Sequence, residues 1–397
     1  MAHLALVAGD PSGDHHAAAL VAALSRLDPS LTFAGLGGPR MRDAGVELLE
    51  DLTHTAAIGP FDAAKHLQRF TQARQRFQDH LRAHRPDLVL LVDFGDFNLP
   101  VIAPLAKRAG ARVVYYISPQ VWAWGRFRLR WVKRYVDRML VLFPFEETFY
   151  RQRGIPVTWV GHPLADSVHQ ALPDRTALQR KLHINPWRMT VGLLPGSRER
   201  EVSRMLPLLL HSASRIAWEM PGVQFVIPQA PGLPDASFTT PLQRYPGLDV
   251  QLIPHQFQQC LHVLDAAIVT SGTATVEVAI AQVPMVVVYR TSWPTYLMAR
   301  AVIRVPHIAM VNVLAGRSVV PEFLQHHANP RCISRAIVGL LRDRERAARM
   351  RQELGETVRQ LGEPGAVDRA ARAVLDELRR KDTPQNHGTT TESQRLR

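Results

Sequence analysis

The segment LALVAGDPSGDHHAAALVAALSRL, residues 4–27, decides the fold class of this chain. Its first part, Leu4–Ala8, is apolar at every position, and a turn containing Gly9 and Gly13 leads into an amphipathic stretch from about Asp14 to Leu27. A strand that is apolar throughout is typical of a parallel sheet covered on both faces. The segment therefore predicts a strand–turn–helix unit of a doubly wound α/β domain.

The same unit recurs in two series, separated by a polar stretch that contains prolines. Besides Leu4–Ala8, we expect strands at 31–36, 88–92, 112–116, 139–143 and 157–160, and then at 189–194, 224–227, 250–253, 266–270 and 284–289. We therefore predict two Rossmann-like domains facing one cleft, residues 1–165 and 187–345, joined by a linker at 166–186. Helices should follow at 346–380. Residues 381–397 have no apolar period and should form a disordered tail.

Composition limits the class of protein. In 397 residues, 46% are hydrophobic and 21% charged, which excludes wholesale disorder. The two cysteines, Cys260 and Cys332, are too few for a disulfide framework or a cysteine zinc site and indicate a reducing compartment. No apolar run has the length of a membrane span or the basic start of a signal peptide, so we expect any membrane contact to be peripheral.

The net charge of +13 is compatible with three kinds of partner: nucleic acid, an anionic membrane surface and a phosphorylated substrate. Composition does not choose among them. No RNA-binding motif accompanies the basic residues, so nucleic acid is the least favoured partner.

Polar residues follow two apolar runs in the first half, where ligands of open α/β sheets bind. The turn AGDPSGD, residues 8–14, places Ser12, Gly13 and Asp14 at a helix start. The turn VDFGDFN, residues 92–98, places Asp93 or Asp96 at the cleft, where a carboxylate could act as a general base. Helix capping is an equally good explanation of these carboxylates.

Two turns of small residues in the second half suggest a diphosphate cradle. LLPGSRERE, residues 193–201, carries Arg198 at a helix start, and TSGTATVE, residues 270–277, repeats the arrangement with Glu277 one turn into the helix. Free N–H groups at a helix start and an arginine both bind phosphate, and a carboxylate can accept hydrogen bonds from a ribose diol. Structural capping is the alternative. The chain has no Asp-x-Asp pair, and its 17 His suit surface or packing positions better than ligation, so we predict neither a metal nor a cofactor.

These motifs occur together with GLGGPRM (35–41), YYISPQVWAW (115–124), VLFPFE (141–146), VGHPLAD (160–166) and NVLAGRSVVPEFLQ (312–325). The set, in this order, resembles the lipid-A-disaccharide synthase family over about residues 4–340. Two positions depart from the family pattern. Asp10 stands where the family often has Glu, and Gly95 stands where we expect Pro.

The resemblance implies an inverting glycosyltransferase of the two-Rossmann GT-B type. Such an enzyme transfers 2,3-diacylglucosamine from UDP to the 6-hydroxyl of 2,3-diacylglucosamine 1-phosphate, forming a β-1,6 disaccharide and UDP. Residues 1–165 would bind the acceptor and residues 187–345 the UDP-sugar. Asp96 would be the base, with Asp14 as the alternative. The implied substrate-binding residues are Ser12, Gly13, Asn98, Arg198, Ser271, Gly272, Thr273, Glu277 and Asn312.

Residues 58–85 are expected to contact the membrane from which the lipids come. Basic residues there (Lys65, Arg69, Arg74, Arg76, Arg82 and Arg85) alternate with an apolar stripe of Phe61, Leu67, Phe70, Phe77 and Leu81. A basic amphipathic helix suits an anionic surface, here the cytoplasmic face of the inner membrane. The alternative is that the stripe packs on its own domain.

Two other functions remain open at this stage. Another GT-B enzyme, such as a UDP-GlcNAc 2-epimerase or a peptidoglycan glycosyltransferase, would share the second-half turns but not YYISPQVWAW. An Arg-rich nucleic-acid-binding protein is supported by charge alone.

Overall fold

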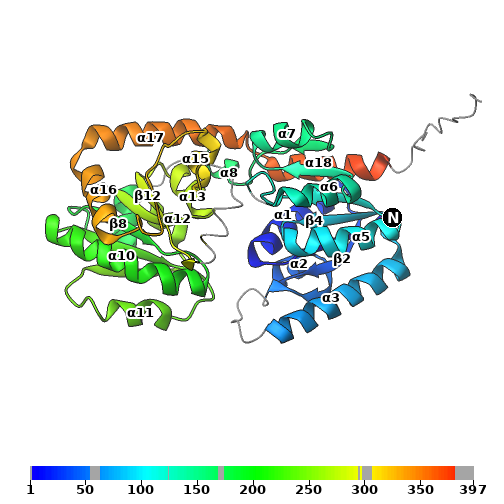
Figure 1. Cartoon of the computed structure of the whole chain (residues 1–397), viewed down its shortest axis with the longest axis horizontal. Coiled ribbons are helices and arrows are strands. Elements are labelled where there is room, and N and C mark those ends of the chain that lie inside the picture. The colour runs from blue at the N-terminus through cyan, green and yellow to red at the C-terminus, as the bar shows by residue number, and fades with distance from the viewer. Residues whose placement is uncertain are drawn as a thin grey trace, which may run out of the picture.

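The computed structural model describes residues 2–53, 63–123, 125–168, 174–293, 296 and 306–380. For residues 63–67 and 167 it describes only the backbone. The chain forms two lobes side by side, each a sheet covered by helices (Figure 1). The predicted disorder of residues 381–397 lies outside the described residues.

The N-terminal lobe contains a parallel sheet in which the described strands have the order β3-β2-β1-β4-β5-β6-β7. Its strands are β1 (His3–Ala8), β2 (Thr32–Gly37), β3 (Glu47–Asp51), β4 (Leu88–Val92), β5 (Arg112–Tyr116), β6 (Arg138–Val141) and β7 (Val157–Trp159). Its helices are α1 (Pro11–Leu27), α2 (Pro39–Asp43), α3 (Ala63–His84), α4 (Gly95–Phe97), η3 (Asn98–Ile102), α5 (Ala103–Arg108), η4 (Arg126–Arg128), α6 (Leu129–Tyr135) and α7 (Pro144–Arg151).

The C-terminal lobe repeats this strand order in a second parallel sheet, β10-β9-β8-β11-β12-β13. After the connecting helices α8 (Ala165–Val168) and α9 (Arg175–Lys181), its strands are β8 (Thr190–Leu194), β9 (Gln224–Gln229), β10 (Val250–Pro254), β11 (Ala266–Thr270), β12 (Met285–Tyr289) and β13 (Glu322–Leu324). The helices between and after them are α10 (Glu199–Glu219), α11 (Ala236–Leu242), α12 (Phe257–Leu261), α13 (Ala274–Ile280), α15 (Met310–Ala315), α16 (Pro330–Arg342), α17 (Arg344–Val358), η5 (Arg359–Leu361) and α18 (Ala366–Arg379).

Central strands account for the apolar runs of the sequence. Every residue of β4, β8 and β11 is buried, as is every residue of β1 from Leu4 onward, because helices cover both faces of each sheet. The predicted fold of two Rossmann-like domains is confirmed. The edge strands β3, β7, β10 and β13 depart from this pattern, because they are mostly half-buried. Of these, β3 and β13 carry acidic residues.

The last described helix, α18, packs on the N-terminal lobe. Helix α18 packs against α1, and Figure 1 shows it beside the N-terminal sheet, far from α16. Glu377, only 1% exposed, accepts hydrogen bonds from Arg112 Nη2 and Arg138 Nε, both at 2.5 Å. Arg26 of α1 pairs with Asp368 at the other end of α18. The predicted helical segment 346–380 is thus divided between the lobes.

Helix α3 packs its apolar stripe into the N-terminal lobe. Phe77 and Leu81 are buried, and the Phe70 ring lies 5.2 Å from that of Phe97. The expectation that this stripe faces a membrane is therefore wrong for these three residues, because the sheet face beneath the helix needs apolar cover. The side chains of Phe61, Lys65 and Leu67 lie outside the described residues.

Within the described ranges, no helix combines the length and the apolar character that crossing a bilayer requires.

Candidate active site

The turn between β1 and α1 holds a carboxylate at the cleft end of the N-terminal sheet. Asp10 caps α1 by accepting a hydrogen bond from Gly13 N at 2.7 Å. Ser12 is exposed in the first helical turn. Gly9 is required here, because a Cβ at this position would lie 2.1 Å from the Phe94 ring. The two turns that follow β1 and β4 are therefore in direct contact.

Asp14, the alternative base, is engaged by backbone N–H groups. Its carboxylate is 2% exposed and accepts hydrogen bonds from Gly38 N, Met41 N and Arg40 N at 2.9, 3.0 and 3.1 Å. These donors lie at the start of α2, so Asp14 ties α1 to α2. These contacts leave almost none of the Asp14 carboxylate accessible.

Asp93 lies where β4 ends, in a left-handed backbone conformation with a φ of 46°. Its carbonyl oxygen accepts hydrogen bonds from Asn98 Nδ2 at 2.9 Å and from the Tyr115 hydroxyl. Burial raises the pKa of the Asp93 carboxyl to about 6, and the neighbouring Asp10 carboxylate adds to that rise. Two side chains thus hold the Asp93 backbone, and the raised pKa brings the titration of its carboxyl close to neutral pH.

Asp96, the predicted base, lies at the surface. Its side chain is 74% exposed and pairs with the guanidinium of Arg128. Asn98, predicted to bind substrate, is fully buried. Besides the Asp93 carbonyl oxygen, Asn98 Nδ2 contacts the carbonyl oxygens of Val7 and Val92, both at 3.4 Å. Asn98 therefore links the ends of β1 and β4.

Arg198 approaches the N-terminal carboxylates from the other lobe. It caps α10, its Nη1 lies 3.1 Å from Glu201 Oε1, and its Nη2 lies 4.0 Å from Asp10 Oδ2. Glu201 also accepts hydrogen bonds from the N–H groups of Ser197 and Arg198. The Arg198 side chain is 66% exposed. A cation from one lobe thus pairs with the Asp10 carboxylate of the other and lies close enough to Asp93 to oppose the rise of its pKa, which brings together three of the turns predicted to carry the chemistry.

The turn after β11 leaves its helix start open. Gly272 and Thr273 are exposed, and nothing lies within 4 Å of the point where a Gly272 Cβ would stand. Ser271 Oγ, in contrast, donates to Ile308 O at 3.0 Å. Glu277 accepts a hydrogen bond from Gln258, and burial raises the pKa of its carboxyl.

Asn312 makes four hydrogen bonds within the loop before β13. Its Nδ2 donates to Val320 O at 2.8 Å and to Glu322 Oε1 at 2.7 Å, and its Oδ1 accepts from Val319 N at 2.8 Å and Val320 N at 2.9 Å. The amide is fully buried and has no hydrogen-bonding capacity left for a ligand. It therefore holds the loop before β13 in place.

A buried acid that the sequence analysis did not select supports the loop after β5. Glu146 accepts hydrogen bonds from Trp122 Nε1 at 3.1 Å and from Leu142 N and Phe143 N at 3.2 Å. Burial raises the pKa of Glu146 to about 7. Trp122 lies in the motif SPQVWAW and Glu146 in the motif VLFPFE. The presence of both motifs was the one sequence signal that could have pointed to this contact.

Within the part of the chain that the structure describes, no three or more His, Cys, Asp or Glu side chains form a group able to hold a metal ion.

Comparison with known proteins identifies the family. The model of the lipid-A-disaccharide synthetase family matches residues 4–376. The lipid-A-disaccharide synthase of Geobacter sulfurreducens is 42% identical over 373 residues, which is 94% of this chain and 96% of that protein. That of Syntrophus aciditrophicus is 41% identical over 95% of this chain and 98% of its own length.

Solved structures of GT-B enzymes share the fold at low sequence identity. The calicheamicin glycosyltransferase CalG4 aligns with a TM-score of 0.60 at 16% identity, covering 96% of this chain and all of its own. MurG of Acinetobacter baumannii gives 0.54 at 14%, covering 95% of this chain and all of its own. With its lobes arranged as in these enzymes, and with the family match spanning nearly its whole length, this chain belongs to the lipid-A-disaccharide synthase family of glycosyltransferases.

Proposed function

We propose that the chain transfers 2,3-diacylglucosamine from UDP to the 6-hydroxyl of 2,3-diacylglucosamine 1-phosphate, producing the β-1,6-linked disaccharide 1-phosphate and UDP. The observation that carries the proposal is the meeting of Asp10 and Asp93 with Arg198 across the two lobes. Glycosyl transfer with inversion requires a base for the acceptor and a cation for the departing diphosphate, and these groups supply both.

Asp93 is our choice for the base, in place of Asp96. Asp93 is half-buried near Arg198 and its pKa is raised to about 6, whereas Asp96 is exposed and paired with Arg128. A base with a raised pKa binds the hydroxyl proton more strongly, and at neutral pH it is still mostly ionised. The Asp93 carboxylate accepts the proton of the 6-hydroxyl while the hydroxyl oxygen attacks the anomeric carbon.

The donor diphosphate binds between the two small-residue turns of the C-terminal lobe. As the bond between the anomeric carbon and the phosphate oxygen breaks, negative charge grows on UDP. Arg198 and the N–H groups near Gly272 and Thr273 stabilise that charge, with Ser271 holding the turn and Glu277 accepting hydrogen bonds from the ribose. Glu201 releases Arg198 when the diphosphate arrives.

The remaining predicted residues fall into two groups. Ser12 and Gly13 line the turn that holds Asp10, and the exposed Ser12 hydroxyl is available to the acceptor. Asp14 and Asn98 bind backbone groups of the turns, and Asn312 binds backbone groups and the Glu322 carboxylate, so we assign all three a positioning role.

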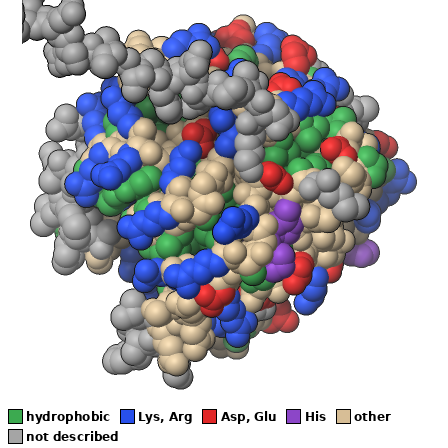
Figure 2. Space-filling model, turned by 90° about the vertical axis from the view of Figure 1, so that its right-hand side faces the viewer, with side chains coloured by type: hydrophobic (Ala, Val, Ile, Leu, Met, Phe, Trp, Pro, Cys, Tyr) green, Lys and Arg blue, Asp and Glu red, His purple; other side chains and the backbone are tan. Residues whose placement is uncertain are grey.

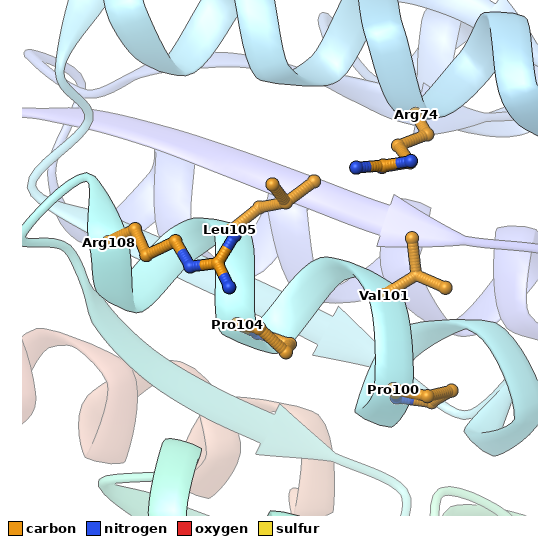
Figure 3. A pocket seen from close by; sticks show the side chains of 6 residues that line it. All are labelled: Arg74, Pro100, Val101, Pro104, Leu105 and Arg108. Atoms are coloured by element: carbon orange, nitrogen blue, oxygen red, sulfur yellow. The ribbon is translucent and has the colours of Figure 1, made fainter.

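Basic residues on the outer end of the N-terminal lobe support contact with the anionic cytoplasmic face of the inner membrane. Figure 2 shows Lys and Arg side chains gathered over this end of the molecule. Between α3 and α5, Arg74 and Arg108 flank a groove of about 290 Å³ with an apolar floor that includes Val101 and Leu105 (Figure 3). Because Phe77 and Leu81 of the α3 stripe are buried, we expect this contact to be electrostatic and salt-sensitive.

Sedimentation with lipid vesicles tests the membrane contact. We expect wild-type protein to bind phosphatidylglycerol vesicles at low salt and phosphatidylcholine vesicles weakly. Replacing Arg74 and Arg108 by Gln should weaken binding, whereas replacing the exposed Arg331 and Arg344 of the other lobe should not. Equal binding to both lipids would refute the electrostatic contact.

Release of UDP from UDP-2,3-diacylglucosamine, with and without the lipid acceptor, tests the reaction. We expect release only when the acceptor is present. Release without acceptor would instead indicate hydrolysis or the epimerase-type chemistry of other GT-B enzymes.

A further inference from the structure

A pocket lies at the carboxyl ends of β12 and β13, the two strands beyond β11 in the C-terminal sheet; we call it the β12–β13 pocket. It has a volume of about 340 Å³ and is lined by Arg290, Thr291, Trp293, Gln325 and His326. The first three residues follow β12, which pairs with β11, and the last two follow β13, which pairs with β12. Because these strands are parallel, the pocket lies at the same end of the sheet as the proposed diphosphate turn after β11.

One buried amide holds the wall of the β12–β13 pocket. Gln325 Oε1 accepts a hydrogen bond from Thr291 N at 2.7 Å, and Gln325 Nε2 donates to Thr291 O at 3.0 Å. The backbone N–H of Gln325 also donates to Tyr289 O at 3.0 Å. Gln325 is only 6% exposed, so these bonds are shielded from water. The pocket is therefore formed before a ligand arrives, which is usual for a ligand site.

Two guanidinium groups from different elements contact this wall. Arg290 Nε donates to Gln325 O, and Nη1 of Arg204 in α10 donates to Thr291 Oγ1, both at 3.3 Å. In the part of the chain that the structure describes, neither guanidinium forms an ion pair with a carboxylate. Each therefore keeps N–H donors and an uncompensated charge for an anionic ligand. Other arginines of the same lobe do pair with Asp or Glu: Arg175, Arg188 and Arg317.

The chemistry of the β12–β13 pocket favours a phosphate group. A guanidinium binds two phosphate oxygens in parallel, and two guanidinium groups together balance the double negative charge of a phosphate monoester. In the proposed reaction, Arg198 and the N–H groups near Gly272 and Thr273 already hold the diphosphate of the donor. The remaining phosphate among the two substrates is the one on the anomeric carbon of the acceptor.

We infer that the β12–β13 pocket binds the anomeric phosphate of the acceptor through Arg204 and Arg290. The inference rests on the proposed function and adds a subsite to it. The acceptor then spans the cleft, with its phosphate on the C-terminal lobe and its 6-hydroxyl at Asp93 of the N-terminal lobe. The C-terminal lobe thus selects the acceptor as well as the donor.

Acceptor selectivity tests the subsite. We expect wild-type enzyme to prefer 2,3-diacylglucosamine 1-phosphate over the same lipid without phosphate. Arg290→Gln should lower the ratio of the two kcat/KM values by ~10–100-fold, the range expected for a charge-assisted contact, and Arg204→Gln should lower it by a smaller factor because its guanidinium is more exposed. The KM for the UDP-sugar should not change in either variant.

Arg244→Gln is the matched control. Arg244 is an exposed arginine of the same lobe, but it follows α11, which connects β9 to the opposite edge strand β10. Its replacement removes the same charge and should leave the ratio unchanged. An unchanged ratio in Arg290→Gln overturns the inference. A raised KM for the UDP-sugar with an unchanged ratio also overturns it, because that result assigns the guanidinium to the donor diphosphate.

A measurement on the unaltered enzyme covers the case in which the variants fail to fold. Phenylglyoxal modifies accessible arginines, and mass spectrometry identifies the modified positions. Glucosamine 1-phosphate should protect Arg204 and Arg290 from modification at concentrations at which glucosamine does not. Equal modification in the presence of the two sugars would contradict the subsite.

Failure of the subsite and failure of the proposed function give different results. Wild-type enzyme that releases no UDP with any acceptor refutes the proposed function itself. Normal release of UDP, with a selectivity that depends on neither Arg204 nor Arg290, refutes only the subsite.

Discussion

The two lobes have the same strand order but use the turns after their strands differently. In the N-terminal lobe, Asp14 and Asn98 are buried and bound to backbone groups of neighbouring turns. In the C-terminal lobe, Gly272 and Thr273 are exposed and Arg198 reaches outward. The first lobe thus ties these polar side chains to backbone groups, and the second leaves N–H groups and a cation exposed, as the proposed binding of a diphosphate would require.

This difference shows that a polar residue after a buried strand has no fixed meaning. The number of backbone N–H groups within reach decides whether a side chain becomes a brace or a ligand contact. Asp14 has three such donors, whereas the carboxylates of Asp10 and Asp93 keep capacity for a substrate. The predictions that follow test this division, beginning with the largest effect.

Replacing Asp93 should abolish most of the activity without unfolding the lobe. Asn has the same shape and tolerates the positive φ at this position, so Asp93→Asn should fold normally. Loss of the base should lower kcat by ~10²–10⁴-fold. Steady-state UDP release measures this, with the melting temperature as the control. An Asp93→Asn enzyme with wild-type kcat would remove Asp93 from the mechanism.

The dependence of kcat/KM on pH should reveal the ionisation of the Asp93 carboxyl. Because burial raises the pKa of Asp93 to about 6, the ionised base is lost as the pH falls through that value, and kcat/KM should drop ~10-fold for each further unit. An unperturbed aspartate would keep the enzyme active down to about pH 4. The measurement spans pH 4.5 to 8, with recovery at pH 7.5 checked after each acid exposure. A flat profile to pH 5 would contradict the assignment.

Asp14→Ala should act on stability. Removing the carboxylate leaves three N–H groups at the start of α2 without their acceptor, which should lower the free energy of unfolding by about 2–4 kcal/mol. Chemical denaturation measures the change, and Asp43→Ala, at an exposed position of α2, should change it little. A stable but inactive Asp14→Ala enzyme would instead make Asp14 the base.

Arg198→Gln should weaken donor binding by a smaller factor. The loss of one charged contact to the diphosphate should raise the KM for the UDP-sugar by ~10-fold. Arg200→Gln, two residues further along α10 and also exposed, is the control for net charge. An effect on the acceptor KM alone would place Arg198 at the other substrate.

The smallest effect is expected at Gly272. Open space surrounds the position of its missing Cβ, so Gly272→Ala should leave the melting temperature unchanged and raise the donor KM a few-fold by crowding the diphosphate. Gly35→Ala is the counterpart in the N-terminal lobe. The Cβ added at position 35 would lie 2.1 Å from the Leu6 carbonyl oxygen, and this clash should destabilise the protein. If both variants behaved alike, the contrast between open and filled turns would fail.

The sequence predicted the fold well because the decisive signal is local. Fully apolar runs such as Leu88–Val92 are strands with both faces covered, and their order places the polar turns at one cleft. The roles within a turn were harder to predict. Asp93 and Asp96 are three residues apart, and the positive φ of Asp93 and Phe94 turns one inward and the other outward. That backbone geometry has no signature in the amino-acid types.

Long-range contacts explain the other differences. The sequence of the α3 stripe is equally compatible with a face that contacts a membrane and with a face that packs on the core. Only the position of the sheet beneath the helix distinguishes the two. The attachment of α18 to the first lobe depends on charge pairs, such as that of Arg26 with Asp368, whose members are hundreds of residues apart. Neither could be found from periodicity.

The return of α18 also bears on how the protein is made. A ribosome delivers the N-terminal lobe first, and domains generally begin to fold during synthesis. Until residues 366–380 emerge, however, Arg112 and Arg138 lack the Glu377 carboxylate, and the α1 side of the sheet lacks its last helix. The N-terminal lobe is therefore translated first but can complete its fold only after the C-terminal lobe has been translated. A nascent or truncated chain that ends before α18 lacks a complete N-terminal lobe, which ties the assembly of that lobe to completion of translation.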